Sequence, residues 1–215
     1  AGLTGVWAEE NTRTSIYSAF RRKETFGTSG PRIKVRFFAG ADMPALETDD
    51  IFREAAKSGV PMGGELTSEG DASPEFLIWA SRDVYSAPLQ RLQVIKANVR
   101  DGNTVERVYD AACSNGGKVD PTTHRCPDNG ATVNLTDCSI SAGVGDGELK
   151  AVWTDPDFDA TEHAFYYVRV LENPVCRWST WDAIRNDAEP RPDLHATIQE
   201  RAWSSPIWFN PNHHE

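Results

Sequence analysis

The chain has 215 residues, of which 39% are hydrophobic and 25% are charged. This balance excludes a disordered tail, and the length fits one large domain or one domain joined to part of another. The net charge of −10 argues against binding to nucleic acid or anionic lipid. No apolar stretch approaches the roughly 20 residues that cross a bilayer, so we expect no membrane partner. The chain begins without a methionine or a signal peptide, which indicates a processed chain or a piece of a longer protein.

The first regular structure is predicted in residues 11–23. Ile16, Ala19 and Phe20 recur at the spacing of one helix face, and Asn11 or Thr12 can cap the start. Residues 25–31 contain two glycines and a proline, which predict that the helix is broken there. We therefore expect one amphipathic helix followed by a turn.

After residue 31 the pattern changes to that of strands. Residues 32–38 alternate charged and apolar side chains, which is typical of a strand with one face in water. Asp101-Gly102 predicts a hairpin turn, and a short helix is possible in residues 49–57. Short strands with almost no helix between them predict a mainly β chain, folded as an antiparallel β-sandwich. The other strand candidates are residues 75–81, 89–99, 104–112, 148–153, 165–171 and 203–208.

The chain has four cysteines, which are Cys113, Cys126, Cys138 and Cys176. Zinc ligands usually come in close pairs, but the gaps here are twelve, eleven and thirty-seven residues, so disulfides are favoured over a metal site. Disulfides indicate a periplasmic or secreted protein. Three pairings are open. We favour Cys113–Cys126 with Cys138–Cys176, because this pairing closes the loop of residues 113–138 locally and then ties it to a later strand.

Seven tryptophans are many for this length, and four of them lie in a carboxyl-terminal segment that we expect to be irregular: Trp178, Trp181, Trp203 and Trp208. Packing of a long loop onto the sheet explains most such clusters and is the expectation we favour. The functional alternative is an aromatic platform for a sugar or another ligand.

The sequence contains no recognisable catalytic constellation. None of the five histidines has metal-binding spacing, and there is no nucleophile elbow or phosphate-binding glycine loop. Asp155, Asp157 and Asp159 resemble the start of a calcium loop. However, Ala160 and Tyr166 stand where such a loop needs Gly and Glu, so a turn is favoured. We assign no catalytic residue, no metal ligand and no cofactor to this chain.

Several strings, taken together and in order, resemble one family. Gly-Val-Trp-Ala-Glu-Glu-Asn-Thr-Arg at residues 5–13 leads into residues 20–33, which include Thr-Ser-Gly-Pro-Arg. Residues 152–158, 166–174, 198–202 and 205–208 follow. This pattern resembles the carboxyl-terminal part of the DUF3604 family, a domain of unknown function found mostly in bacterial, often exported, proteins. The first helix and its turn are also similar to the last helix of PHP-type metallohydrolases.

The resemblance implies two parts. Residues 1–31 would be the closing helix and turn of an upstream α/β, PHP-like domain, and residues 32–215 its appended β-sandwich. The upstream domain would be this chain's partner and would hold a divalent metal that activates water, since the metal-binding motifs of such enzymes precede this helix. The full protein would be a metal-dependent hydrolase of phosphate, sulfate or related esters, and this chain its non-catalytic portion.

Two interpretations follow. In the first, the chain packs against the catalytic domain and shapes the pocket rim with Glu9, Glu10, Asn11 and Arg13. In the second, it is an independent secreted binding module whose Trp-rich surface holds a ligand or partner. The apolar stripe of the first helix distinguishes them, because burial on the chain's own sandwich favours the module and exposure favours the first interpretation. The sequence leaves the substrate and the oligomeric state open.

Overall fold

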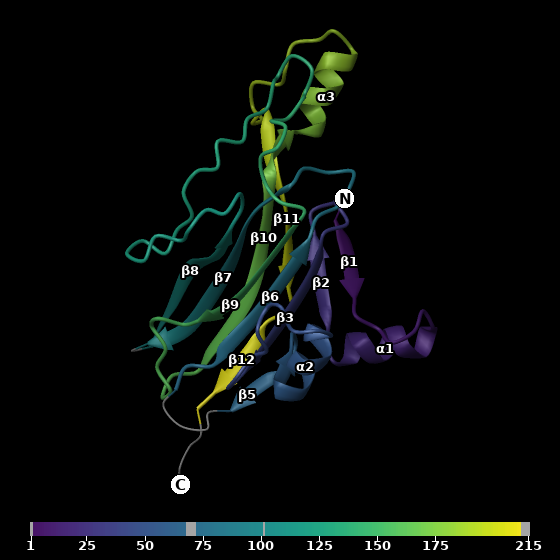
Figure 1. Ribbon diagram of the computed structural model, residues 1–215. Helices are drawn as coiled ribbons and strands as arrows, with labels where there is room; N and C mark the ends of the chain where they lie inside the picture. Colours follow the sequence, from purple (N-terminus) through teal and green to yellow (C-terminus); the bar gives the residue numbers. More distant parts are fainter. Residues whose placement is uncertain (1, 68–71, 101, 212–215) are drawn as a thin grey trace.

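A computed structural model describes residues 2–67, 72–100 and 102–211. It consists mainly of antiparallel strands in two sheets that share one apolar core, so the predicted mainly β fold is confirmed (Figure 1). Three helices in these residues lie outside the sheets. They are α1 (Arg13–Arg21), α2 (Ile51–Ser58) and α3 (Trp178–Arg185). No helix in this described part of the chain is long and apolar enough to cross a membrane.

The larger sheet has eight strands. The order of hydrogen-bonded strands is β1-β2-β11-β10-β12-β5. In addition, β7 pairs with β10, and β8 pairs with β7. All pairs are antiparallel except β12 with β5. The strands are β1 (Leu3–Val6), β2 (Thr25–Thr28), β5 (Glu65–Thr67), β7 (Leu89–Arg100), β8 (Asn103–Cys113), β10 (Ala164–Cys176), β11 (Thr197–Ser204) and β12 (Ile207–Asn210).

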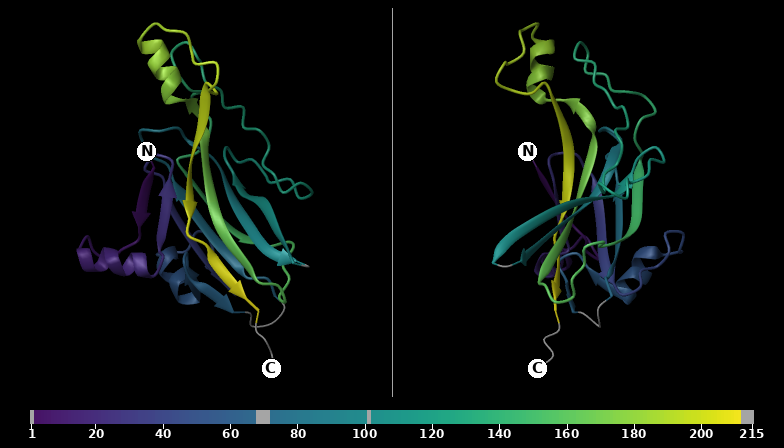
Figure 2. Two further views of the ribbon diagram at one scale, coloured as in Figure 1. Left: turned by 180° about the vertical axis from the view of Figure 1, so that it is seen from behind. Right: turned by 90° about the vertical axis from the view of Figure 1, so that its left-hand side faces the viewer.

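The smaller sheet has four antiparallel strands in the order β4-β3-β6-β9. They are β4 (Gly59–Pro61), β3 (Lys34–Gly40), β6 (Glu75–Ser81) and β9 (Glu148–Thr154). In the right-hand view of Figure 2 the green and yellow strands β10 and β11 form one layer, and the purple-blue and blue strands β3 and β6 lie beside it, to the right. Phe76 of β6 packs on Tyr166 of β10 with ring centroids 4.6 Å apart, which joins the layers.

The predicted alternation in β3 is confirmed in its first half only. Val35 and Phe37 face the core while Lys34 is exposed. Phe38, which should face water, is only 2% exposed because α2 covers the outer face of the sheet there. The short helix predicted in residues 49–57 is this α2, and its Ala55 and Phe52 pack on Phe38 in a second, smaller cluster.

Two sequence-based expectations about the strands are wrong. Residues 25–31 were expected to be a break, but Thr25–Thr28 form β2 between β1 and β11. Residues 203–208 were expected to be one strand, but they are divided between β11 and β12. Pro206 has no N–H to give to a sheet, so the chain changes strands at this point.

The remaining predicted strands are confirmed, including the hairpin of β7 and β8. Arg100 lies opposite Asn103, and Gly102 has a positive φ of 74° that suits a tight turn. Asp101, the other residue of the predicted turn, lies outside the described residues.

The predicted disulfide pairing is confirmed. Cys113 bonds to Cys126, and Cys138 bonds to Cys176 at the end of β10. Two disulfides indicate an oxidising environment outside the cytoplasm. The second disulfide fastens the long loop after β8 to the end of β10, two residues before α3, which lies at the top of Figure 1.

The two disulfides should contribute unequally to stability. Loop-closure entropy grows with loop length, and the separations are 13 residues for Cys113–Cys126 and 38 for Cys138–Cys176. We expect Cys138→Ser/Cys176→Ser to lower the free energy of unfolding by about 4 kcal/mol and Cys113→Ser/Cys126→Ser by about 3 kcal/mol. Urea denaturation of both double variants measures this, and the reverse order would contradict it.

Candidate functional site

The four residues expected at a pocket rim lie together in the connection from β1 to α1. Glu9, Glu10 and Asn11 are in the loop and Arg13 begins the helix, and all four are exposed. The loop is shaped by capping, because Thr12 accepts a hydrogen bond from the Ser15 backbone N–H. The structure therefore brings these side chains to one surface, at the outer edge of the larger sheet.

The apolar stripe of α1 is covered only in part. Ala19 is buried and Ile16 is partly buried, but Phe20 is 50% exposed, and Tyr17, which lies beside the stripe, is 62% exposed. Figure 1 shows α1 lying to the side of β1, away from the two layers. β1 ends the path of the sheet and has β2 as its only neighbour among the described strands. A helix with exposed aromatic side chains thus adjoins an edge strand.

Trp7 fastens this amino-terminal segment to the sandwich. Its indole Nε1–H donates to the Val35 carbonyl at 2.7 Å, and its ring lies 5.9 Å from that of Phe26. The guanidinium of Arg36 stacks 3.6 Å from the Trp7 ring centroid and 5.4 Å from that of Phe52. Burial lowers the pKa of Arg36. The segment carrying α1 is therefore held firmly although its outer face is uncovered.

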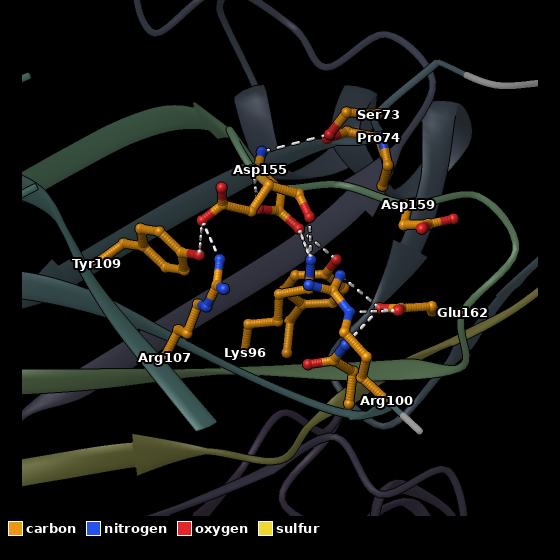
Figure 3. Close-up of polar contacts among 12 residues, drawn as sticks. Ser73, Pro74, Lys96, Arg100, Arg107, Tyr109, Asp155, Asp159 and Glu162 are labelled. Atoms are coloured by element: carbon orange, nitrogen blue, oxygen red, sulfur yellow. Dashed lines mark hydrogen bonds and ion pairs between the residues drawn. The ribbon is translucent and has the colours of Figure 1, made fainter. Parts of the chain in front are cut away.

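A network of charged residues lies where the connection from β9 to β10 passes over β7 (Figure 3). Lys96 of β7 donates from Nζ to Asp155 Oδ2 at 2.5 Å and to the Asp157 carbonyl at 2.7 Å. The Lys96 and Asp155 side chains are 4% and 0% exposed. Tyr166 of β10 donates its hydroxyl to the same Asp155 oxygen at 2.8 Å. Two ionisable side chains thus share an interior that normally excludes charge.

The outer residues of the network lie closer to solvent. Their hydrogen bonds and ion pairs fix the connection between β9 and β10 to the hairpin of β7 and β8. Asp157 accepts hydrogen bonds from Arg107 and from the Tyr109 hydroxyl, each at 2.6 Å. The Tyr109 bond is the main cause that lowers the pKa of Asp157, while burial raises the pKa of Tyr109. Glu162 pairs with Arg100 at 2.6 Å. Each carboxylate has a partner of its own.

The Asp155-Asp157-Asp159 motif forms the turn that the sequence favours. Asp155 Oδ1 accepts the Asp157 N–H at 2.9 Å, and Asp159 accepts from the Thr161 N–H and hydroxyl. No group of three or more His, Cys, Asp or Glu side chains within the described ranges is arranged to hold a metal. The motif organises a loop over the buried Lys96.

Lys96 is a residue that the sequence alone did not identify. Its one signal is the alternation Leu92, Val94, Lys96, which places the lysine on the inward face of a strand. Its partner Asp155 is 59 residues away, and nothing in either local sequence identifies the other.

The Trp-rich segment departs from the expected packing. Trp178 and Trp181 lie on α3, a helix that the sequence did not predict, and they are 63% and 36% exposed instead of packing a loop onto the sheet. The Arg185 guanidinium lies 5.1 Å from the Trp181 ring. On the far side of α3, Thr180 and Ile184 help to line a cavity of about 320 Å³ together with Leu135 of the disulfide-bearing loop. Two aromatic side chains are therefore presented to solvent at one end of the molecule.

The family model described as protein of unknown function (DUF3604) matches residues 1–211. The chain belongs to this family. No curated protein matches it significantly. The match covers α1 and the sandwich together, so both are parts of the DUF3604 sequence pattern.

Glu172 of this DUF3604 chain is a buried acid outside the network. It is 0% exposed, and Oε2 accepts a short hydrogen bond from the Ser86 hydroxyl, whereas Oε1 has no partner among the described residues. Burial, with help from the charges of Glu200 and Asp83, raises the pKa of Glu172 to about 7. The protonated acid is therefore the form that the fold favours.

Glu172 should make stability fall as the pH rises. The folded chain holds the proton more tightly than the unfolded chain, so the contribution is complete below the ordinary pKa of 4.5 and is lost by about pH 7. We expect the free energy of unfolding to fall by about 3 kcal/mol over this window, and by much less in Glu172→Gln.

Urea denaturation at about pH 5 and about pH 8 measures this difference. Glu148→Gln, at an exposed position of β9, is the matched control and should keep the wild-type pH dependence. An equal pH dependence in Glu172→Gln and wild type would contradict the assignment.

Proposed function

We propose that this chain is the non-catalytic carboxyl-terminal part of a metal-dependent hydrolase and docks on the catalytic domain through α1 and β1. The observation that carries the proposal is the exposure of the aromatic side chains Tyr17 and Phe20 on α1. The stripe of Ile16, Ala19 and Phe20 divides between the two interpretations: this chain itself buries Ala19 and partly covers Ile16, whereas the exposed Phe20 favours a chain that meets another domain.

The docking surface has the composition of an interface. Leu3 on β1, Tyr17 and Phe20 on α1 are 44%, 62% and 50% exposed, and α1 contacts β1. Clustered exposed aromatic side chains mark interaction sites, and a sheet edge is usually covered or protected. The occupant we propose is the PHP-like domain of the same protein, because the helix and its Thr-Ser-Gly-Pro-Arg turn resemble the last helix of such domains.

The loop from β1 to α1 gives the chain its role in this proposal. Glu9, Glu10, Asn11 and Arg13 are exposed beside the docking surface, where they would form part of the rim of the catalytic pocket. The divalent metal and its ligands would belong to the catalytic domain, and the substrate would be a phosphate, sulfate or related ester. The two disulfides support a periplasmic or secreted location.

The proposal predicts protection of α1 in the full-length gene product. Amide hydrogens of α1 should exchange at least about tenfold more slowly there than in the isolated chain, because docking suppresses local opening. Tyr17→Lys/Phe20→Lys should abolish this protection without unfolding the sandwich. Hydrogen–deuterium exchange with mass spectrometry measures both effects.

The matched control is Val84→Lys/Tyr85→Lys, a pair that is 72% and 92% exposed in the connection from β6 to β7. It should leave the protection of α1 unchanged. Equal exchange of α1 in the isolated chain and the full-length protein would refute docking. So would ester hydrolysis by the isolated chain with added Mn²⁺ or Zn²⁺, because the proposal places the metal in the other domain.

The alternative function, a ligand-binding module, rests on the exposed Trp178 and Trp181 of α3. An aromatic platform binds a sugar ring by stacking, and the alternative predicts that Trp178→Ala weakens oligosaccharide binding by about tenfold or more. Trp208→Ala, at a 41% exposed position on β12, is the control and should have no effect. Calorimetric titration measures both, and absence of binding by the wild-type chain would remove the alternative.

A further inference from the structure

The Lys96–Asp155 pair joins the two sheets across the core. Lys96 belongs to β7 of the larger sheet, and Asp155 directly follows β9 of the smaller sheet. We infer that these two side chains condense spontaneously into an amide, an intramolecular isopeptide bond between Lys96 Nζ and Asp155 Cγ. The inference is independent of the proposed function.

The surroundings keep water away from both groups. The side chains are 4% and 0% exposed, and the Tyr166 ring lies 5.9 Å from Nζ and contacts Phe76 and Trp153. Two desolvated charges are costly to bury, and condensation to a neutral amide removes both of them. The contact of 2.5 Å between Nζ and Oδ2 holds the amine nucleophile beside the carboxyl group. Such proximity can remove a large part of the activation free energy of a reaction.

The two Asp155 oxygens have different partners, which suits them to different roles. Oδ1 accepts a hydrogen bond from the Asp157 backbone N–H at 2.9 Å. This donor can stabilise negative charge on Oδ1, the oxygen that would become the amide carbonyl oxygen. Oδ2 accepts a hydrogen bond from the Tyr166 hydroxyl at 2.8 Å. This donor can assist the departure of Oδ2, the oxygen that would leave as water. The Asp157 carbonyl accepts one Nζ hydrogen at 2.7 Å and orients the amine.

The condensation is balanced without any added reagent. One proton passes from the Lys96 ammonium to Asp155 Oδ2, which gives a neutral amine and a neutral acid. The Nζ lone pair forms a bond to Cγ, a second Nζ proton passes to Oδ2, and the Cγ–Oδ2 bond breaks to release one water. The amide keeps one hydrogen on Nζ, which still donates to the Asp157 carbonyl.

The test is the mass of the full chain after reduction of its disulfides and denaturation. The wild-type chain should be lighter than its sequence by one water. Trypsin should fail to cut after Lys96 and should release a branched peptide that joins residues 92–100 to residues 151–169. A chain of full sequence mass, with cleavage after Lys96, would overturn the inference, and this measurement needs no variant to fold.

The control variant is Lys96→Arg, which keeps the positive charge but has no amine to condense. It should have its full sequence mass. Imide formation at Asp-Gly sequences also releases water, and it would persist in Lys96→Arg and give no branched peptide. Water loss that is equal in Lys96→Arg and wild type would therefore refute the isopeptide bond.

Discussion

The pairing of β10 on both of its edges is the constraint on which the other parts of the structure depend. β10 pairs with β7 along one edge and with β11 and β12 along the other. Its inward side chains, including Tyr166 and Val168, are fully buried and meet the smaller sheet. The helices α1 and α3 at the periphery are both attached to β10. The segment of α1 is attached through β2 and β11, and α3 is attached beside the disulfide at Cys176. Neither helix has an apolar core of its own.

The buried charges show what such a fold tolerates. Lys96 points into the core, and removing an ammonium from water is costly unless a partner compensates it. Asp155 provides that partner, and the turn formed by its two following carboxylates covers the pair from solvent. Glu172 lacks an opposite charge and instead favours its protonated form. The same sandwich thus contains a buried ammonium, that of Lys96, that is compensated by a carboxylate. It also contains a buried acid, Glu172, that has no opposite charge beside it and is accommodated by protonation.

The length of each element decides what the sequence can reveal. Strands such as β6 and β7 have seven and twelve residues, and their composition predicted them nearly to the residue. β1 and β2 have four residues each, too few for alternation to be recognised. They are strands because β11 offers an edge to β2, and β2 in turn offers an edge to β1. α3 has no side-chain cap at Arg177, so no start signal exists. Cysteine spacing predicted the disulfides, whereas the Lys96 network depends on contacts between distant strands. The rim residues follow from the family resemblance alone and stay a prediction.

The attachment of α1 bears on how a docked catalytic domain would be oriented. β2 is hydrogen-bonded to β11, Ser29 N–H donates to the Arg201 carbonyl, and Trp7 is fixed between Phe26 and Arg36. Residues 2–28 are therefore continuous with the sheet and are not a flexible tether. A domain that covers α1 would for that reason fix the whole sandwich in one orientation relative to its own pocket. A rim contributed by Glu9 to Arg13 needs this rigidity, because side chains on a loosely tethered module cannot hold a constant distance from a reacting ester.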